Sequence, residues 1–285
     1  MSSQPKVYLI TSCSSGLGLE LACAALLAGH KVIATSRNPP KTPNVLLDIQ
    51  SCGGHWAELD VTASNLDEQF QGLVKVYGRI DVLINNAGFA IGNTVENTNL
   101  DLARKLFETN FFRVVQLCQL CIPIMRKQSG GTIVNISSGV TVHPVPMVSI
   151  YAASKCAIDG FIESLRGEVA VFGIRVLLAQ PRDMKTSFKE NAPVMDVPEV
   201  YKGTPTEMVI NYLMSTRGKE AIDPRRSAKR IVEVVDGTGM AEDLNTEENF
   251  RIPLGSEIQG SIQGRIEELK RVIEVYDKVC ESVDF

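Results

Sequence analysis

A tyrosine and a lysine one helical turn apart are the most informative pair of side chains in the sequence. Tyr151 and Lys155 open a segment with helical periodicity, and residues four positions apart lie on one face of a helix. A phenol has an ordinary pKa of about 10, so it exchanges protons poorly at neutral pH. A positive charge one turn away stabilises the phenolate and moves that pKa toward the working range. We therefore predict that Tyr151 and Lys155 act together in proton transfer.

A serine in the preceding segment extends this set. Ser138 ends the apolar run 133–138, which has the pattern of a buried strand. Its hydroxyl can donate a hydrogen bond to a carbonyl oxygen of a substrate. A Tyr-x-x-x-Lys pair alone occurs in many helices, but together with a strand-end serine and a glycine-rich turn it indicates an active site.

The glycine-rich turn runs from Thr11 to Gly18, between a predicted strand and a predicted helix. Backbone amides at a helix N-terminus bind a pyrophosphate, and glycines let the phosphate approach the chain closely. Such a turn also occurs where a helix simply packs closely on a strand. Taken by itself, the turn leaves both interpretations open.

Arg37 follows the second predicted strand, at the position that faces the adenosine ribose in a dinucleotide-binding fold. There an acidic residue binds the ribose 2′-hydroxyl, whereas an arginine accommodates a 2′-phosphate. The sequence has no Asp or Glu between His30 and Lys41. A solvated surface arginine is the alternative, but with the glycine turn upstream Arg37 predicts NADP(H) rather than NAD(H).

The scaffold for these residues follows from short β-branched runs that alternate with longer helical segments, the pattern of βαβ units. The runs are apolar throughout, which is typical of strands buried on both faces of a parallel sheet. Strands are expected at 7–10, 31–35, 56–59, 82–84, 131–136 and 174–179. Helices are expected at 16–28, 65–77, 100–126, 151–172 and 224–235, followed by a loop at 251–254 and an amphipathic helix at 264–279.

The pattern changes after Pro181, where Met and aromatic residues are scattered among prolines and charges. This composition fits a lid over a bulky apolar substrate, and it equally fits a helical excursion packed onto a core. No repeat or linker divides the chain. We expect one domain over residues 1–285, with a core at 6–236, a helical lid at about 182–222 and a C-terminal extension at 237–285.

Composition excludes several classes of protein. The net charge of −4 lacks the basic excess of a nucleic-acid-binding protein, and no apolar run reaches the ~20 residues of a membrane span. Seven cysteines without a secretory signal indicate reduced thiols and a cytoplasmic protein. Cys118 and Cys121 lie in an apolar helical stretch, so we interpret them as core thiols rather than as a redox pair, and we expect no metal.

In this arrangement of motifs the chain resembles the short-chain dehydrogenase/reductase family over residues 6–236. The landmarks, in chain order, are Thr11…Gly16-Leu17-Gly18, Asp60-Val61, Asn85-Asn86-Ala87-Gly88, Thr109-Asn110, Ile136-Ser137-Ser138, Tyr151-x-x-x-Lys155 and Pro181…Thr186. The Cys13–Gly18 turn, the run Ile80–Asn85 and the tail Ile252–Ser256 are similar to the hydroxysteroid-dehydrogenase-like branch of the family. The resemblance implies an α/β fold with a Rossmann-like doubly wound parallel sheet.

The resemblance also implies roles for individual residues. Tyr151 would donate the proton in ketone reduction, and Lys155 would lower its pKa and hold the nicotinamide ribose. Ser138 would bind the substrate oxygen, and Asn110 would hold a water in a proton relay. The implied cofactor-binding residues are Thr11, Ser14, Ser15, Gly16, Leu17, Gly18, Arg37, Asp60, Val61, Asn86, Ala87, Gly88, Tyr151, Lys155, Pro181, Met184 and Thr186. The predicted helices at 100–126 and 151–172 commonly pair subunits in this family, which implies a homodimer or homotetramer.

Two positions depart from the family pattern, because Ser12 and Arg182 stand where the family has glycine. Glycine is the residue most tolerant of positive φ, so we expect Ser12 to keep a negative φ. Arg182 follows the sixth predicted strand, beside the nicotinamide in the family. It either turns outward, as loop arginines usually do, or lines the substrate pocket and binds a carboxylate or a polar oxygen.

These observations lead to one principal hypothesis and two alternatives. The first is an NADPH-dependent carbonyl reductase, reversible in principle, that acts on a bulky, mostly apolar ketone or secondary alcohol. The second is the same fold catalysing atypical or non-redox chemistry on a complex natural product, for which Ser12 and Arg182 are the hints. The third is an inactive NADP(H)-binding protein, against which the intact set of Asn110, Ser138, Tyr151 and Lys155 argues.

Overall fold

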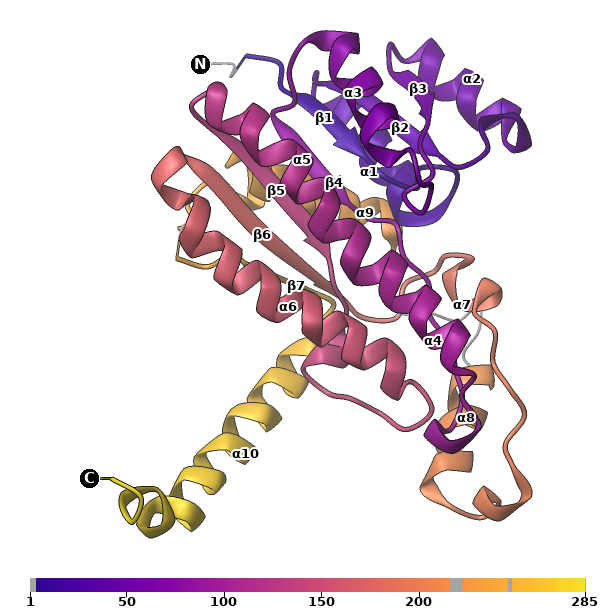
Figure 1. The fold of residues 1–285 in the computed structure, drawn as a ribbon, viewed down its shortest axis with the longest axis vertical. Coiled ribbons are helices and arrows are strands. Elements are labelled where there is room, and N and C mark those ends of the chain that lie inside the picture. Colours follow the sequence, from indigo (N-terminus) through magenta and orange to yellow (C-terminus); the bar gives the residue numbers. More distant parts are fainter. Residues whose placement is uncertain (1–3, 216–221, 246–247, 285) are drawn as a thin grey trace.

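The computed structural model describes residues 4–215, 222–245 and 248–284. A seven-stranded sheet with the order β3-β2-β1-β4-β5-β6-β7 forms its centre (Figure 1). The strands are β1 (Val7–Ile10), β2 (Lys31–Ser36), β3 (His55–Glu58), β4 (Val82–Asn85), β5 (Gly131–Ile136), β6 (Ile174–Pro181) and β7 (Arg251–Leu254). Every pair of neighbouring strands is parallel. The prediction of a Rossmann-like doubly wound sheet is therefore confirmed.

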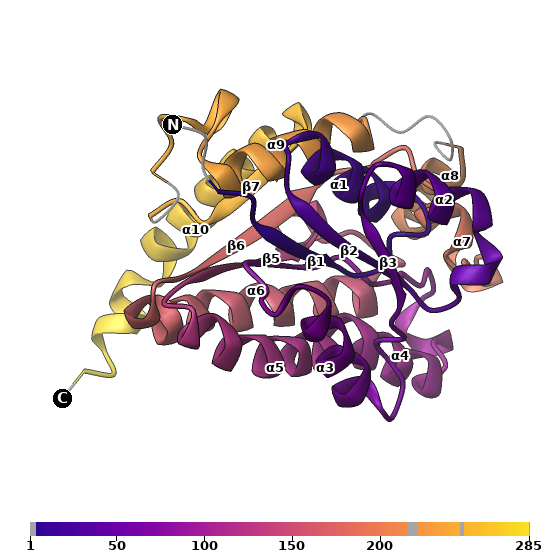
Figure 2. The ribbon, with the colours of Figure 1, turned by 90° about the horizontal axis from the view of Figure 1, so that it is seen from above.

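Helices cover both faces of the sheet (Figure 2). Helices α1 (Gly16–Leu27) and α9 (Pro224–Asp236) pack together on one face, and α3 (Leu66–Tyr77), α5 (Arg113–Lys127) and α6 (Ser149–Val169) cover the other. Because the strands lie between two helical layers, residues such as Leu9, Leu83 and Ile133 have no exposed surface. This burial explains why the strands are apolar along their whole length. Helix α2 (Pro43–Ser51), which the sequence analysis did not predict, connects β2 with β3.

The long helix expected at 100–126 is interrupted. The chain forms α4 (Leu100–Phe107), one π-helical turn (Glu108–Phe112) and then α5. Single π-helical turns inside α-helices are frequent at functional sites. This one contains the buried Asn110, whose side chain is bonded to a neighbouring loop and to α6. Periodicity did not reveal this turn, because it interrupts the helical pattern over only a few residues and depends on the hydrogen bonds of Asn110.

The C-terminal extension differs from the prediction at two places. Residues 251–254, expected as a loop, form β7, which pairs with residues 178–181 of β6 and completes the sheet. Ile252 and Leu254 are buried there, so the short run is stabilised by tertiary packing that its length did not signal. The terminal helix α10 (Ser256–Glu281) begins earlier than the expected residue 264.

The segment between β6 and α9, which we call the lid after its predicted role, contains α7 (Phe188–Asn191) and α8 (Pro205–Ser215). It is attached to the loop after β4, because Gly92 donates its backbone N–H to Pro193 and accepts from Met195 at 2.9 and 3.0 Å. A Cβ at Gly92 would approach the side chain of Val194 to 3.1 Å, so the close contact favours glycine. Among the described helices, none is both long and apolar enough to cross a membrane.

Candidate active site

The carboxyl ends of β1 and β4 meet where the strand order reverses. The Thr11 hydroxyl accepts the backbone N–H groups of Asn86 and Ala87, both at 2.9 Å. The Asn86 side chain donates in return to the carbonyl oxygens of Thr11 and Ser12, at 2.9 and 3.2 Å. Ligands of doubly wound sheets bind in the crevice at this reversal. The bonds between Thr11 and Asn86 therefore fix one wall of a candidate nucleotide site.

The glycine-rich turn has the form that a pyrophosphate site needs. Helix α1 begins at Gly16 with no acidic residue in its first turn, and the Ser15 side chain does not cap it. Its first amides are therefore available to an anion. A Cβ at Gly18 would lie 2.2 Å from the Ser12 carbonyl oxygen, and Gly16 has a φ of +59°. The residues present thus fit a bound pyrophosphate, with Ser14 half-buried in the same turn and Leu17 buried in the core.

The expectation of a negative φ at Ser12 is wrong, because its φ is +60°. The turn holds this conformation through the bond from Asn86 to the Ser12 carbonyl and a 2.7 Å bond from the Cys13 N–H to Thr35. A left-handed conformation costs a non-glycine residue about 1 kcal/mol. Ser12 therefore adopts the left-handed backbone conformation that a glycine would adopt without this energetic cost.

The predicted adenosine-side residues lie along the ends of β2 and β3. Arg37 is exposed directly after β2, and Val61 is buried. The Asp60 carboxylate accepts the backbone N–H and the hydroxyl of Thr62 at 2.9 and 2.8 Å, which fixes its orientation. Arg37 and Asp60 follow neighbouring strands, as required for two walls of one adenosine pocket.

Tyr151, Ser138 and Lys155 converge at the carboxyl end of β5, as predicted. Tyr151 and Lys155 lie in the first turns of α6 and are nearly fully buried, and Ser138 follows β5 and is hydrogen-bonded to Tyr151. Lys155 Nζ donates to the Ile136 carbonyl oxygen at 2.8 Å. Gly88 closes the other side, because a Cβ there would lie 3.6 Å from Lys155 Nζ.

Burial dominates the proton affinities of this pair. It raises the pKa of Tyr151 to about 12, against the lowering effect of the Ser138 hydrogen bond. It lowers the pKa of Lys155 to about 8, partly offset by the charge of Asp159. Lys155 Nζ turns toward the Ile136 carbonyl and lies 5.9 Å from the ring centroid of Tyr151, and a lowering of the Tyr151 pKa by Lys155 stays a prediction. At neutral pH Tyr151 therefore holds its proton and can serve as a donor.

Asn110 lies close to this pair but is engaged with protein groups. Its Nδ2 donates to the Phe89 carbonyl at 2.9 Å and to the Ser154 hydroxyl at 3.1 Å, and its Oδ1 accepts the Phe89 N–H at 3.1 Å. A Cβ at Gly88 would lie 3.1 Å from Oδ1. The π-helical turn thus connects α6 with the loop after β4, and a water held by Asn110 stays a prediction.

A buried polar network behind the site was not predicted. Asp159, one turn beyond Lys155, is bonded to Ser137, and it accepts from Gln180 at 2.9 Å and from Arg251 at 3.1 Å. The network joins α6 to β5, β6 and β7. The spacing of four residues between Lys155 and Asp159 was the available signal, because it places a carboxylate on the same helical face.

The predicted residues after β6 lie over the glycine turn and the tyrosine. Pro181 ends β6, and Met184 pairs with Ile222 across the base of the lid. The Thr186 side chain lies 3.3 Å from where a Cβ of Gly16 would be. The ring of Phe188, not singled out beforehand, lies 6.1 Å from that of Tyr151. The start of the lid therefore covers both the phosphate turn and the proton donor.

Arg182 is neither turned outward nor aimed freely into a pocket. Its guanidinium is paired with Glu257 of α10 at 3.2 Å, and its side chain is only 23% exposed. Its aliphatic part lies against Gly139 and Gly255, where a Cβ would approach to 2.8 and 3.4 Å. Its Nε is buried without a hydrogen-bond partner among the described residues. A role in substrate binding stays a prediction.

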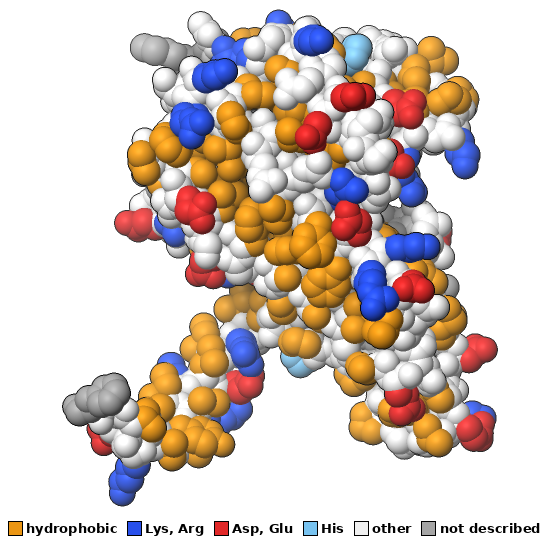
Figure 3. Space-filling model, viewed as in Figure 1, with side chains coloured by type: hydrophobic (Ala, Val, Ile, Leu, Met, Phe, Trp, Pro, Cys, Tyr) orange, Lys and Arg blue, Asp and Glu red, His pale blue; other side chains and the backbone are white. Residues whose placement is uncertain are grey.

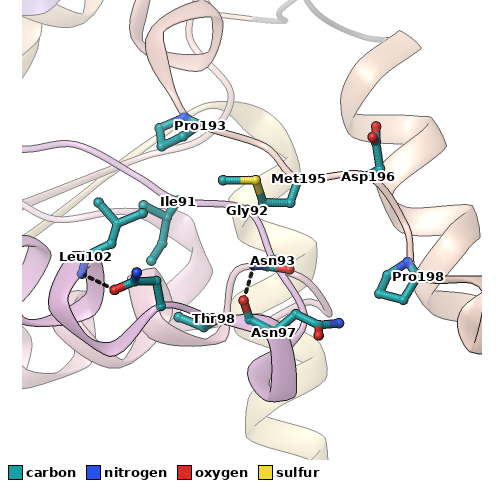
Figure 4. Close-up of a pocket in the computed structure, with 11 residues that line it drawn as sticks. Ile91, Gly92, Asn93, Asn97, Thr98, Leu102, Pro193, Met195, Asp196 and Pro198 are labelled. Atoms are coloured by element: carbon teal, nitrogen blue, oxygen red, sulfur yellow. Dashed lines mark hydrogen bonds between the residues drawn. The ribbon is translucent and has the colours of Figure 1, made fainter.

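A cavity of about 370 Å³ lies between the loop after β4 and the lid (Figure 4). Ile91, Leu102 and Met195 give it an apolar wall, and Asn93 and Asn97, joined by a 2.8 Å hydrogen bond, give it a polar one. Ile91 and Leu102 also belong to the small apolar cluster that contains Tyr151. The cavity and Tyr151 therefore border the same apolar cluster.

The described residues contain no group of three His, Cys, Asp or Glu placed to hold a metal ion. All seven cysteines are free thiols. Cys118 and Cys121 lie in the core as predicted, and burial raises the pKa of Cys118 to about 12.

Comparison with known proteins agrees with this geometry. Residues 6–195 match the family model described as short chain dehydrogenase. Oxidoreductase claN of Passalora fulva is 41% identical over 71% of this chain and 93% of its own length. A 3-ketodihydrosphingosine reductase of Bacteroides thetaiotaomicron is 37% identical over 68% of this chain and 70% of its own length.

Solved structures share the whole architecture. A short-chain dehydrogenase from Streptomyces avermitilis has a TM-score of 0.86 and 29% identity, covering 99% of this chain and all of that one. Two more distant proteins of the same fold, at 20% and 19% identity, were solved with NAD (Burkholderia phymatum, TM-score 0.79, covering 95% of this chain and 96% of that one) and with 5-hydroxy-NADP (Thermococcus sibiricus, TM-score 0.69, covering 88% and 96%). The chain belongs to the short-chain dehydrogenase/reductase family of oxidoreductases, whose members use a nicotinamide cofactor.

Proposed function

We propose that this protein is an NADP(H)-dependent ketone reductase and secondary alcohol dehydrogenase for bulky, mostly apolar substrates. The observation that carries the proposal is the buried Tyr151 hydroxyl, hydrogen-bonded to Ser138 and with Lys155 one turn away. A bound nicotinamide supplies the hydride, and the protein supplies orientation and the proton.

Three side chains have separate roles in substrate binding and proton transfer. Ser138 binds the substrate carbonyl oxygen, and Tyr151 donates its proton to that oxygen as negative charge develops on it. Lys155, held at 2.8 Å from the Ile136 carbonyl, places a positive charge beside Gly88, where it stabilises the phenolate that remains. In alcohol oxidation the same residues act in reverse, with Tyr151 as the base.

The preference for NADP(H) rests on Arg37. It is exposed directly after β2 and faces solvent on the adenosine side, where it can pair with a 2′-phosphate. Asp60 and Val61 would bind the adenine side, the first turn of α1 the pyrophosphate, and Lys155 the nicotinamide ribose. The relatives do not decide this point, because one structural neighbour carries NAD and another an NADP derivative.

The preference for an apolar substrate rests on the walls around Tyr151. Ile91, Leu106 and Tyr151 form a buried apolar cluster, and Phe188 of the lid contacts the tyrosine ring. A relative at 37% identity is named as a 3-ketodihydrosphingosine reductase, so a keto compound is its named substrate. Free thiols are consistent with a cytoplasmic location, and the exposed Leu100 and Phe112 of the α4–α5 region are available to a subunit interface.

Replacing Tyr151 with Phe is expected to lower carbonyl-dependent NADPH oxidation by about 10²–10⁴-fold, because the proton donor is lost. NADPH affinity, measured by enhancement of its fluorescence, is expected to persist. Tyr77→Phe, at the far end of α3, is the control and leaves turnover unchanged. Full turnover in Tyr151→Phe would contradict the assigned role and would favour the alternative of atypical chemistry on the same fold.

Replacing Arg37 with Ala is expected to weaken NADPH binding by about 10-fold or more, since a hydrogen bond to a charged group contributes about 1.5–3 kcal/mol. NADH affinity should stay the same, so the two cofactors become similar. Fluorescence titrations with both cofactors measure the difference, and Arg104→Ala on the exposed face of α4 is the control. Equal affinities of the unaltered protein for NADPH and NADH would refute the assignment.

Replacing Arg182 with Ala is expected to raise the KM for a polar carbonyl substrate about 10-fold, if its guanidinium donates to a substrate oxygen. Glu257→Gln is the matched control, because it breaks the ion pair with α10 and leaves Arg182 in place. A purely structural role predicts that both variants lower the melting temperature alike while KM is unchanged, and that result would end the substrate-binding hypothesis.

A further inference from the structure

Helix α10 leaves the body of the molecule as a free arm. Its first turn is anchored by Ile258, which is fully buried, whereas every described residue from Gln263 to Asp284 is exposed. Figures 1 and 2 both show the helix projecting away from the sheet and the lid. Most helices in proteins are stabilised chiefly by packing of an apolar face rather than by intrinsic propensity. The exposed part of α10 lacks such packing.

Several patches of apolar side chains are visible along the arm (Figure 3), and one set of apolar residues has the spacing of a helical stripe. Their spacing alternates between four and three residues at Ile262, Ile266, Leu269, Ile273, Tyr276 and Cys280, and Val283 continues it. Ile273 is 67% exposed and Tyr276 53%. An average period of 3.5 residues is the heptad pattern of a two-stranded coiled coil, whose a and d positions face the partner helix. The stripe thus fits another helix better than a flat surface.

The charges on α10 argue against a membrane as its partner. Residues 256–284 contain four Lys or Arg and seven Asp or Glu. Helices that lie on anionic membranes carry an excess of basic residues on their polar face. A second helix with the same heptad pattern is available in another copy of this chain.

The orientation of such a pair follows from the residues that flank the stripe. Arg265 occupies a g position, and Lys270 and Asp277 occupy successive e positions. A parallel pair would place Arg265 opposite Lys270 of the partner subunit, which is a like-charge contact. An antiparallel pair brings e positions together, and one register places Lys270 opposite the partner's Asp277 on both sides. The two neighbouring registers would place Lys270 against Lys270, or Asp277 against Asp277.

The favoured register also matches the length of the arm. It places Ile273 opposite the partner's Tyr276, Leu269 opposite the partner's Cys280, and Ile266 opposite the partner's Val283. The partner's Asp284 then lies opposite Arg265, two residues after the exposed part of α10 begins at Gln263, and the partner's Glu281, its last helical residue, lies opposite Glu268. The paired segment therefore uses the exposed residues and stops where the body begins.

We propose that residues 263–284 form an interaction surface for the same residues of a second copy, as an antiparallel pair with two-fold symmetry. The interface is isologous, because each arm contributes the same surface, and the assembly therefore ends at two arms. It buries the apolar stripe and satisfies two reciprocal ion pairs. The proposal does not depend on the proposed function, since the arm carries none of the assigned catalytic or cofactor-binding residues.

The charge pattern gives the first test. Lys270→Asp and Asp277→Lys each create like-charge contacts in the favoured register, so each is expected to halve the apparent mass measured by sedimentation velocity. The double exchange, Lys270→Asp with Asp277→Lys, restores opposite charges and is expected to restore the mass. Glu267→Lys, outside the predicted e and g positions, is the control. An apparent mass that the single variants leave unchanged would overturn the proposal.

Oxidative crosslinking tests the register directly. In a protein with the exposed Cys52 and Cys156 changed to Ser, Leu269→Cys is expected to form an intersubunit disulfide with Cys280 of the partner. The same protein with Cys280 also changed to Ser is the control and should remain uncrosslinked on a non-reducing gel. Efficient crosslinking through Cys280 alone would indicate a parallel pair, and no crosslinking with Leu269→Cys would exclude the pair; either result overturns the proposal.

A vesicle assay tests whether a membrane, rather than a second copy of the chain, binds the apolar stripe. The protein is expected to stay in solution when mixed with phosphatidylserine vesicles, because its arm is acidic. Sedimentation with the vesicles, lost on Ile273→Asp, would show that the stripe binds lipid and would contradict the proposal.

Discussion

The hydrogen bond from Lys155 to the carbonyl of Ile136 connects helix α6 to the end of strand β5, and the geometry of the active site depends on it. The bond fixes the ammonium in a buried position beside Gly88. Because Tyr151 is one turn earlier in the same helix, the bond also fixes where the phenol meets Ser138. Asp159, one turn later, attaches the same helix to β6 and β7. The positions of Tyr151 and Lys155, and with them the proposed proton chemistry, thus depend on where α6 is held.

Burial, rather than the neighbouring charge, controls which proton is available. Removing a phenol and an ammonium from water disfavours the charged form of each, so the pKa of Tyr151 rises to about 12 and that of Lys155 falls to about 8. A protonated tyrosine is what ketone reduction requires. The lid contributes to this burial through Phe188, which lies against the tyrosine ring. In the proposed function, the same segment would therefore link substrate access with proton affinity.

The sequence predicted those features that depend on local pattern. The first six strands, their parallel arrangement and the meeting of Ser138, Tyr151 and Lys155 follow from periodicity and from residues placed at strand ends. The strand β7 was missed because its four residues include Arg251 and Pro253, which weaken a strand pattern, and because it is stabilised by pairing with β6. The π-helical turn at Asn110 and the positive φ of Ser12 were missed for a related reason. Both depend on hydrogen bonds to residues distant in sequence, Phe89 and Ser154 in one case and Asn86 in the other.

The ionisation of Tyr151 tests the central claim most directly. The protein can be labelled with ¹³C at the tyrosine ring carbon that bears the hydroxyl, and Tyr151→Phe identifies the resonance. In a pH titration followed by NMR, Tyr151 is predicted to remain protonated well beyond the ordinary phenol pKa of about 10 and to ionise near 12. Ionisation at or below pH 10 would show that a charge, rather than burial, sets the proton affinity, and would contradict the account.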